Sequence, residues 1–579
     1  MPDSKSSLFL KHKVKFDDAL IIGIMAVLAG CGLIYEYLLS HYAARVLGAV
    51  ENTIFAMIGI MIVSMGLGAF AAKKLKDPFS SFAWLELAIA LLGLSAVFLI
   101  ALTFSLANTF PQLIAETYDL PPDLQPQGGL LQLFNSIATF SPYFMGFLLG
   151  ILIGIEIPLI AKIREDIYQA HIANNAGTVY GADYIGAGIG AAIWVLFMLS
   201  MEISTAAAAT ASANLIAGLL FYFRYHSKIR FSQLYLLCHL ILIAATLIVF
   251  EYGNEWELTL ENTLYKDNVI YSTHTKYQHV TVTQRVMDPS EAPIYSLFIN
   301  GRTQFSSIDE AVYHEMLVHL AMAASANHKN ILIVGGGDGL AAREVLKWNP
   351  EKVTLLDLDE AVIDFFKEEK FDDDLGIIIN SALLNLNQHA LTDPRLKIEI
   401  GDAFNKIDEL LKQQKLYDTI IVDLPDPNHP DLNKLYTDRF YQKLSLLLAG
   451  DGAMVVQSTS PYHAQEAFLS IGKTMKAAGF LHVEQYHTNV PSFGEWGWTI
   501  TTKTGQSSLA RLKSIKKLPI KTQWLSLELA KAAFHFPNNY FTGLANIKIN
   551  ALGSHTLYNY HQQAWQKEQG IYKNDEKLN

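Results

Sequence analysis

Seven apolar segments, each long enough to cross a lipid bilayer, crowd the first half of this chain. They lie near residues 18–40, 52–72, 83–106, 132–161, 178–200, 205–223 and 232–251. A spanning helix needs about 20 apolar residues, because only helices and closed barrels satisfy their backbone hydrogen bonds in hydrocarbon. The first segment is too long for a cleaved signal peptide and is followed by others. We therefore predict an α-helical membrane domain of about seven transmembrane helices over residues 1–252.

Basic residues flank these segments unevenly. Lys and Arg gather in the N-terminal tail and after the second, fourth and sixth segments, whereas the loop 107–131 has none. The positive-inside rule then places the N-terminus in the cytoplasm. Seven crossings from there leave the C-terminal half outside, unless one segment does not cross, a further crossing is hidden, or the rule fails. The sequence leaves these alternatives open.

Three carboxylates stand inside apolar segments: Glu36 in LIYEYLL, Glu156 in GIEIPLI and Asp183 in GADYIGAG. Charge is costly in hydrocarbon, so each is a candidate for an intramembrane polar site. One interpretation is a path for a cation. The other is a carboxylate that caps or bonds a neighbouring helix, and no motif decides between them. For Gly186 and Gly190, a G-x-x-x-G pair, we expect close helix packing.

Composition excludes several classes of protein. The formal net charge is -11, which gives no basic surface for nucleic acid. Cys31 and Cys238, the two cysteines, both lie in apolar segments and provide neither a disulfide framework nor the spacing of a metal site. We therefore expect no nucleic-acid partner and no metal.

From about residue 255 the hydrophobic pattern changes. The period-two segments HVTVTQRV and IYSLFING predict a small antiparallel β unit over 255–310. Strands and helices alternate over 311–515, which predicts a parallel sheet between helices, an α/β Rossmann-like domain of the methyltransferase type. We expect an irregular surface excursion over 369–395 and a helical tail over 516–579.

Acidic residues follow the predicted strands. The loop GGGDG puts Asp338 where a dinucleotide enzyme would bind a pyrophosphate, and a carboxylate there favours a cation such as a sulfonium or an amine. Asp357 ends the next strand and is placed to accept both ribose hydroxyls of a nucleoside, with Asp359 as the alternative. Asp402 and Ala403, in GDAF, reach the same edge and suit an adenine ring.

Asp423 and Asp426 lie three residues apart in DLPDP, after a further strand. An aliphatic amine is mostly protonated at pH 7, since its pKa lies near 10.4, the value for Lys. A carboxylate beside it can take the proton and orient the nitrogen. A turn or cap role is the default for isolated acids in a loop. We favour catalysis because the other acids share this edge.

Seven motifs, in this order and spacing, resemble those of spermidine synthases, the polyamine aminopropyltransferase family: YQH, DEAVYHEM, GGGDG, DLDEAVI, GDAF, DLPDP and LYTDRFY. The resemblance covers about residues 265–500, and the apolar half resembles the N-terminal spans of long, membrane-fused members. It implies transfer of the aminopropyl group of decarboxylated S-adenosylmethionine, a co-substrate, to putrescine, with no other cofactor. The products are spermidine, S-methyl-5'-thioadenosine and a proton.

The resemblance also implies roles for single residues. Asp423 is the proton acceptor. The amine or the aminopropyl arm is held by Tyr313, His314, Asp338, Asp426 and Gln304. The nucleoside is contacted by Gln278, Asp357, Asp402, Ala403 and Pro430.

The chain departs from the family pattern at three positions. Asp357 stands where the family usually has Glu, and Asn300 replaces an Asp. Val490 occupies the place of a tyrosine that faces the amine, where Glu495 or Trp496 could substitute. These departures bear on the acceptor amine more than on the nucleoside.

Two other functions compete with this interpretation. A methyltransferase is disfavoured, because the acids of the predicted cleft offer no partner for the methionine carboxylate. The second is a membrane transporter or sensor whose C-terminal domain binds polyamine without turnover; Asp423 weighs against it and the intramembrane acids weigh for it. From the enzyme interpretation we expect a multi-pass protein of the inner cell membrane, a cytoplasmic catalytic domain despite the positive-inside count, and a homodimer or higher oligomer.

Overall fold

The computed structural model describes residues 4–47, 50–118, 129–168, 174–263, 265, 267–275, 277–372 and 376–568. The chain folds into two compact units, Met1–His279 and Val280–Asn579. The division falls later than the predicted boundary near residue 252, because strand β1 (Asn268–His274) packs against helix α7 (Ser232–Asn262) of the first unit.

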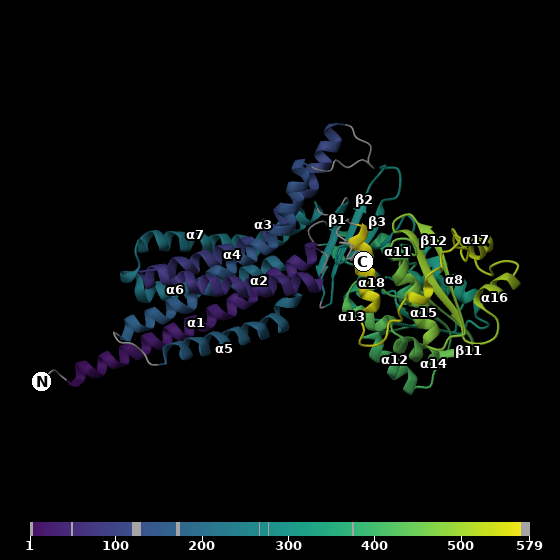
Figure 1. Ribbon diagram of the computed structural model, residues 1–579. Helices are drawn as coiled ribbons and strands as arrows, with labels where there is room; N and C mark the ends of the chain where they lie inside the picture. Colours follow the sequence, from purple (N-terminus) through teal and green to yellow (C-terminus); the bar gives the residue numbers. More distant parts are fainter. Residues whose placement is uncertain are drawn as a thin grey trace, which may run out of the picture. The chain divides into compact units, whose positions relative to one another are not determined.

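The first unit is a bundle of long helices (Figure 1). Besides α7 it contains α1 (Ser4–Leu47), α2 (Val50–Ala71), α3 (Pro78–Thr117), α4 (Gly129–Tyr168), α5 (Asn175–Leu196) and α6 (Ile203–Tyr225). Each predicted apolar segment corresponds to one of these helices, although α1, α3 and α7 extend well beyond the predicted bounds. Within the described residues, seven helices are long and apolar enough to cross a membrane, judged by length and composition.

Glycines let the helices of the bundle touch backbone to backbone. A Cβ built on Gly186 of α5 would collide with the carbonyl of Ala26 on α1, and one on Gly190 would collide with the backbone of Gly30. The packing role predicted for this G-x-x-x-G pair is confirmed. Gly154 of α4 lies equally close to the backbone of α2. Small side chains thus set the spacing between the helices.

Two ion pairs tie α1 to its neighbours near its N-terminal end. Arg164 Nε of α4 lies 2.7 Å from Asp18 Oδ1, and Arg224 Nε of α6 lies 2.7 Å from Asp17 Oδ1. Arg164 is 4% exposed, so its charge depends on this partner. The bundle therefore matches acids with arginines at this level.

The second unit is built on a seven-stranded sheet of order β12-β13-β11-β10-β5-β6-β9. The strands are β5 (Asn330–Gly335), β6 (Lys352–Asp357), β9 (Leu396–Ile400), β10 (Tyr417–Asp423), β11 (Leu448–Gln457), β12 (His482–Val490) and β13 (Gly494–Thr502). The first five are parallel, whereas β12 and β13 form an antiparallel hairpin beside β11. The predicted Rossmann-like sheet is confirmed.

Helices pack on both faces of this sheet. Leu332 and Val334 of β5 face a core shared with α12 (Ala403–Lys412), α14 (Asp438–Leu447) and α15 (Gln465–Ala477). Ile331 and Ile333 point the opposite way and are also fully buried. An unbroken apolar strand of this kind needs cover on both sides. Further helices of this unit are α8 (Glu310–Ala324), α9 (Leu340–Leu346) and α10 (Glu360–Lys367).

A smaller antiparallel sheet precedes α8, and it begins later than the predicted β unit over 255–310 because α7 runs to Asn262. Its strands β2 (His279–Arg285), β3 (Ile294–Ile299) and β4 (Arg302–Ser306) pair in sequence order. The β3–β4 turn puts Asn300 at φ 50° and Gly301 at φ 74°. Asn tolerates this left-handed conformation, so the departure at position 300 fits the turn.

Two expectations for the second unit were wrong in part. The segment 369–395 is not a surface excursion, because it contains β7 (Phe371–Asp372), β8 (Ile377–Ile378) and α11 (Ser381–Leu386), and its Asn380 and Asn387 are fully buried. Their amides donate to main-chain carbonyls, and Asn387 Nδ2 lies 3.0 Å from the carbonyl of Asp338.

Within its described residues, up to 568, the tail is helical in α17 (Leu527–Ala532), a short 3₁₀ turn, and α18 (Thr556–Glu568). The residues between these elements are irregular and contact other parts of the second unit. Lys473 of α15 donates to the carbonyls of Leu544, Ala545 and Ile547. Tertiary contacts, and not helix formation, therefore order this stretch.

We predict that Gly186→Ala destabilises the bundle, because the added methyl must displace the backbone of α1. Overpacking of this kind costs about 1–3 kcal/mol. The matched control is Gly188→Ala on the same helix, where a Cβ has nothing within 4 Å. Apparent melting temperatures of the full chain in detergent should fall for the first variant only. Equal melting temperatures would contradict the close α1–α5 contact.

Candidate active site

The site forms where neighbouring parallel strands end at one edge of the large sheet. In the register of β10 and β5, Asp423 pairs with Gly335, the first residue of the glycine loop. On the other side of β5, Asp357 is the last residue of β6. Ligands of open parallel sheets bind at this edge. Asp338, Asp357 and Asp423, predicted from separate motifs, therefore lie around one loop.

The glycine loop is shaped by contacts that no larger residue allows. Gly335 and Gly336 have φ of 85° and 72°. A Cβ on Gly335 would collide with the carbonyl of Asp423, and one on Gly337 would lie 2.9 Å from the carboxylate of Asp357. The loop thus packs against the main chain of Asp423 and against the carboxylate of Asp357.

Asp423 is oriented by a tyrosine. The hydroxyl of Tyr313, on α8, donates to Asp423 Oδ1 at 2.7 Å. Burial raises the pKa of Asp423 to about 6, helped by the charge of Asp338 and opposed by His314 and by the bond from Tyr313. A carboxylate whose pKa lies near neutral pH is suited to accept a proton.

His314 acts as an internal cation in this acidic region. Burial opposes its charge, but the hydrogen bond to Glu310 and the fields of Glu310, Asp338 and Asp423 raise the pKa of His314 to about 9. Its Nδ1 lies 3.0 Å from the Glu310 carboxylate, which Arg343 also binds with two hydrogen bonds of 2.8 Å. A protonated imidazole has no lone pair for an amine. His314 therefore balances the charges of Asp338 and Asp423.

Asp338 lies between these groups. Its Oδ1 accepts from the backbone of Leu340 at 2.8 Å, which fixes the start of α9. Burial raises the pKa of Asp338, and His314 lowers it. Asp338, Asp423 and His314 are thus electrostatically coupled, and a cation bound among them would draw both carboxyl groups to the charged form.

At the β6 end, the structure separates the two ribose candidates. Asp359 caps α10, because its side chain accepts from the backbone of Ala361 at 3.2 Å. Asp357 faces the glycine loop and accepts from the backbone of Asp359 at 3.0 Å. Burial raises the pKa of Asp357 to about 6. The geometry favours Asp357 as the ribose residue.

Asp402 is already engaged twice. It caps α12 through the backbone of Phe404 at 2.8 Å, and its Oδ2 lies 2.5 Å from Lys434 Nζ. Ala403 is the first residue of α12, and Pro430 begins the short helix α13 (Pro430–Asn433). An adenine amino group would have to share Asp402 with Lys434, a residue that the sequence did not single out.

Asp426 is held by three donors: Gln457 at 2.9 Å, Thr459 at 3.2 Å and His561 at 3.2 Å. His561 belongs to α18, 135 residues further along the chain. Both groups are buried, at 2% exposure for His561 and 13% for Asp426. The C-terminal tail therefore supplies part of the site, which no local motif could predict.

Aromatic rings surround Tyr313. The ring centroid of Trp498 lies 5.6 Å from that of Tyr313, and that of Phe493 lies 5.9 Å away. The candidates proposed to replace the missing tyrosine are placed otherwise. Val490 is fully buried at the end of β12, Glu495 pairs with His487, and Trp496 packs against Phe493. Phe493 and Trp498 are the rings that sequence reasoning missed.

Two predicted residues are not joined to this group. Gln304 turns its amide to the carbonyls of Arg302 and Thr303, at 3.2 and 3.4 Å. Gln278 belongs to the first unit. Their contacts with substrate stay predictions.

Comparison with known proteins agrees with this geometry. Residues 310–513 match the family model of the spermine/spermidine synthase domain. A polyamine aminopropyltransferase of Shewanella oneidensis is 55% identical over 556 residues, with 96% of each chain covered. The chain belongs to the polyamine aminopropyltransferase family. A further relative, polyamine aminopropyltransferase 1 of Streptomyces coelicolor, is 32% identical and again covers 96% of each chain.

The resemblance predicted from the motifs is thus confirmed, and the protein is an enzyme, an aminopropyltransferase. Because the matches cover nearly the whole chain, they include the helical N-terminal unit, so this is the long form of the family. A solved spermidine synthase in complex with the transition-state analogue AdoDATO aligns with 26% identity and a TM-score of 0.42, over 48% of this chain and 90% of that chain.

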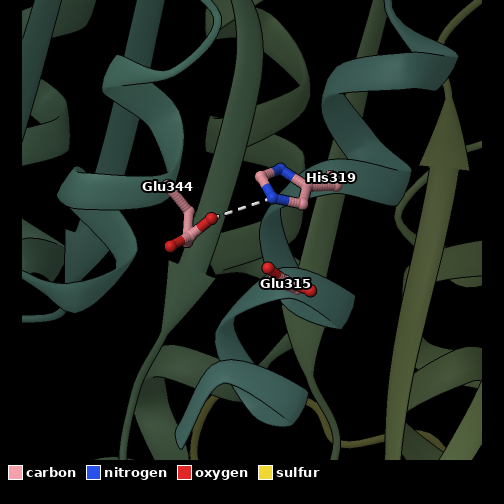
Figure 2. A group of neighbouring side chains, drawn as sticks. All are labelled: Glu315, His319 and Glu344. Atoms are coloured by element: carbon pink, nitrogen blue, oxygen red, sulfur yellow. Dashed lines mark ion pairs between the residues drawn. The ribbon is translucent and has the colours of Figure 1, made fainter. Parts of the chain in front are cut away.

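One cluster of the aminopropyltransferase has the composition of a metal site: Glu315, His319 and Glu344, shown in Figure 2. His319 and Glu344 form an ion pair at 2.9 Å. Protein donors already use the remaining ligand atoms. Glu315 accepts three backbone N–H groups of residues 523–525, Trp348 donates to His319, and Arg343 and Lys347 donate to Glu344. The cluster fastens the tail to α8.

We predict that Tyr313→Phe shifts the acid limb of activity to higher pH. The hydroxyl lowers the pKa of Asp423, so its loss raises that pKa further above about 6. Asp423 must be deprotonated to accept a proton, and the raised pKa extends the inactive, protonated form upward in pH. The pH profile of kcat/KM for the amine, at saturating nucleoside, checks this.

Tyr441→Phe is the control for this shift. Tyr441 is also fully buried, and its hydroxyl has no hydrogen-bond partner among the described residues. Its profile should match that of the unmodified enzyme. An acid limb that moves equally in both variants, or in neither, would remove Tyr313 from the control of Asp423.

Proposed function

We propose that the enzyme moves the aminopropyl group of decarboxylated S-adenosylmethionine to putrescine, giving spermidine and S-methyl-5'-thioadenosine. The observation that carries the proposal is Asp423 at the end of β10, oriented by Tyr313 at 2.7 Å and packed on the glycine loop that holds Asp338. This arrangement suits a reaction between two cations, one of which must lose a proton.

The reaction is a single displacement. The putrescine nitrogen attacks the methylene carbon next to the sulfonium, and a C–N bond forms as the C–S bond breaks. The electron pair of the broken bond stays on sulfur, which becomes a neutral thioether. Asp423 takes the proton that the amine nitrogen must release. Positioning and electrostatic stabilisation supply most of the acceleration in a step of this kind.

Carboxylates counter the repulsion between the two substrates. Asp338 and Asp423 lie near the sulfonium and the attacking amine in this proposal, and Asp426 supports the diamine. His314 offsets part of the negative charge of these carboxylates, since its pKa is raised to about 9. When a substrate cation arrives, it adds to the field of His314 and favours the ionised carboxylates.

The nucleoside lies along the neighbouring strands in this proposal. Asp357 accepts the ribose hydroxyls, Asp402 and Ala403 receive the adenine, and Pro430 and Gln278 line its side. Asp357 is one methylene shorter than the Glu usual in the family. Its position directly against Gly337, 2.9 Å from a Cβ built there, brings the ribose close to the loop.

Aromatic faces replace a hydroxyl at the acceptor end. Val490 cannot hydrogen-bond an amine, whereas Trp498 and Phe493 lie around Tyr313. Rings of this kind attract an ammonium through cation–π interactions, worth about 0.5–2 kcal/mol. We therefore keep a linear diamine such as putrescine as the acceptor.

We propose that the first unit anchors the enzyme in a membrane. Its helices are long and apolar enough to span one, and we propose a multi-pass protein of the inner cell membrane, assembled at least as a homodimer. The catalytic unit faces the cytoplasm in this proposal, because its nucleoside substrate is made there.

We predict that the full chain in detergent converts decarboxylated S-adenosylmethionine and putrescine to spermidine, detected by mass spectrometry. Asp423→Asn should lower kcat by about 10²–10⁴-fold, the range for loss of a general base, and keep nucleoside affinity. Asp357→Ala should mainly weaken the nucleoside, read from its KM.

The two variants control each other. Full turnover in Asp423→Asn would remove that residue from the base role. A change in putrescine affinity alone for Asp357→Ala would overturn the ribose assignment. If cadaverine or spermidine reacts and putrescine does not, the proposed acceptor is wrong while the transfer itself stands.

Reporter fusions at the C-terminus test the proposed orientation. We expect a fluorescent protein that folds only in the cytoplasm to be bright there, and alkaline phosphatase, active only in the periplasm, to be silent. The N-terminus provides the control, since its lysines place it inside. The reverse pattern at the C-terminus would place the catalytic unit outside.

A further inference from the structure

The helical unit contains a second buried acidic group, remote in sequence from the active site. Glu86 of α3 and Glu156 of α4 are each 2% exposed. Their charges interact with each other and with Cys31 of α1, so the three side chains lie near one another inside the bundle. The sequence singled out Glu156 but missed Glu86.

Polar atoms without partners surround these acids. Asn214 Nδ2 of α6 donates to Glu86 Oε2 at 2.9 Å. Glu86 Oε1, Asn214 Oδ1 and the hydroxyl of Tyr35, which interacts electrostatically with Glu86, have no hydrogen-bond partner in the described part of the chain. Tyr35 and Asn214 are 0% and 1% exposed. Buried polar groups left in this state destabilise the folded protein.

No basic side chain satisfies the two glutamates. Among the described residues, no Lys or Arg pairs with Glu86 or Glu156. The same bundle pairs Asp17 and Asp18 with arginines at 2.7 Å. The lack of a basic partner therefore distinguishes Glu86 and Glu156 from Asp17 and Asp18 in the same bundle.

The partners that the group lacks are donors. Carboxylate and amide oxygens accept hydrogen bonds, and a tyrosine hydroxyl can accept as well as donate. We propose that Glu86, Glu156, Asn214 and Tyr35 form a binding site for a protonated aliphatic amine within the helical unit. The ammonium supplies N–H donors to the unpaired oxygens, and its charge offsets that of the carboxylates.

The chemistry of the group suits an organic cation. Its carboxylate, amide and hydroxyl oxygens can accept hydrogen bonds from ammonium N–H groups, and its two carboxylates match the two charges of a diamine. Among the described residues, the group of three His, Cys, Asp or Glu ligand atoms within 4.8 Å of one another is the one on α8 and α9, so Glu86, Glu156 and Cys31 do not form such a group. The choice of putrescine as the probe rests on the function proposed above.

The structure also divides the acids predicted as one polar site. Glu156 interacts electrostatically with Asp183 of α5, which is half-buried and extends the group. Glu36, on α1, has no such interaction with Glu86 or Glu156. It therefore lies outside the proposed site and serves as a matched control.

Equilibrium dialysis of radiolabelled putrescine against the full chain in detergent tests the proposal. We expect the Asp423→Asn chain, which does not turn over, to bind putrescine at the bundle site. The substitutions Glu86→Gln and Glu156→Gln together should remove this binding. Glu36→Gln should bind as the unmodified chain does. Aminopropyl transfer, measured in parallel, reports on the catalytic site alone, so failure of the transfer and failure of bundle binding are distinguishable.

Tyr35→Phe is the second variant, in case the paired glutamine substitutions prevent folding. It keeps the ring and removes one hydroxyl, and we expect putrescine binding at the bundle site to weaken about 5-fold, the worth of one hydrogen bond. Unchanged bundle binding in this variant and in the glutamine variant would overturn the proposal. Loss of the bundle site in the Asp423→Asn chain, whose helical unit is unchanged, would overturn it as well.

Discussion

The contact between the end of β10 and the glycine loop is the constraint on which the active site depends. The carbonyl oxygen of Asp423 lies so close to Gly335 that a Cβ there would collide with it. This close approach is possible only because adjacent parallel strands end together and the loop turns with positive φ. It brings the carboxylate of Asp423 beside Asp338, and the burial that follows raises the pKa of Asp423 to about 6. The same contact thus sets the position of the Asp423 carboxylate and, through burial, its raised pKa.

Placing several carboxylates together requires compensation. The aminopropyltransferase provides it inside the protein, through His314, Glu310 and Arg343. Glu310 accepts from both cations and makes His314 more basic, so the pocket keeps one positive charge among its acids. A substrate cation then enters a region whose negative charge is partly offset by His314. Breaking this network would leave a buried charge without its partner, which is more costly than never forming the pair.

Sequence reasoning succeeded where the relevant geometry is local. Strand, loop and helix follow one another within a few residues at Asp338, Asp357 and Asp423, so their common edge could be predicted from alternation alone. It failed where a partner comes from far along the chain. His561 reaches Asp426 across 135 residues, and Lys434 reaches Asp402 across 32. The buried role of Asn387 was missed for the same reason, because the segment around it has no periodic pattern and is ordered by contacts with Phe366 and Asp338.

One of these distant contacts, and a further one from α8, join the C-terminal tail to the active site. Glu315 on α8 binds the backbone of residues 523–525, while His561 on α18 binds Asp426. The same helix α8 carries Tyr313 and His314, so the tail is anchored at one end to the helix that orients Asp423 and at the other to the neighbouring acid itself. Asp426 accepts from Gln457, the last residue of β11, from Thr459 just after it, and from His561 of the tail. A catalytic unit that ended after α16 (Ser508–Ser514) would keep every motif of the family and still lack a donor to Asp426. The tail is therefore part of the architecture of the site.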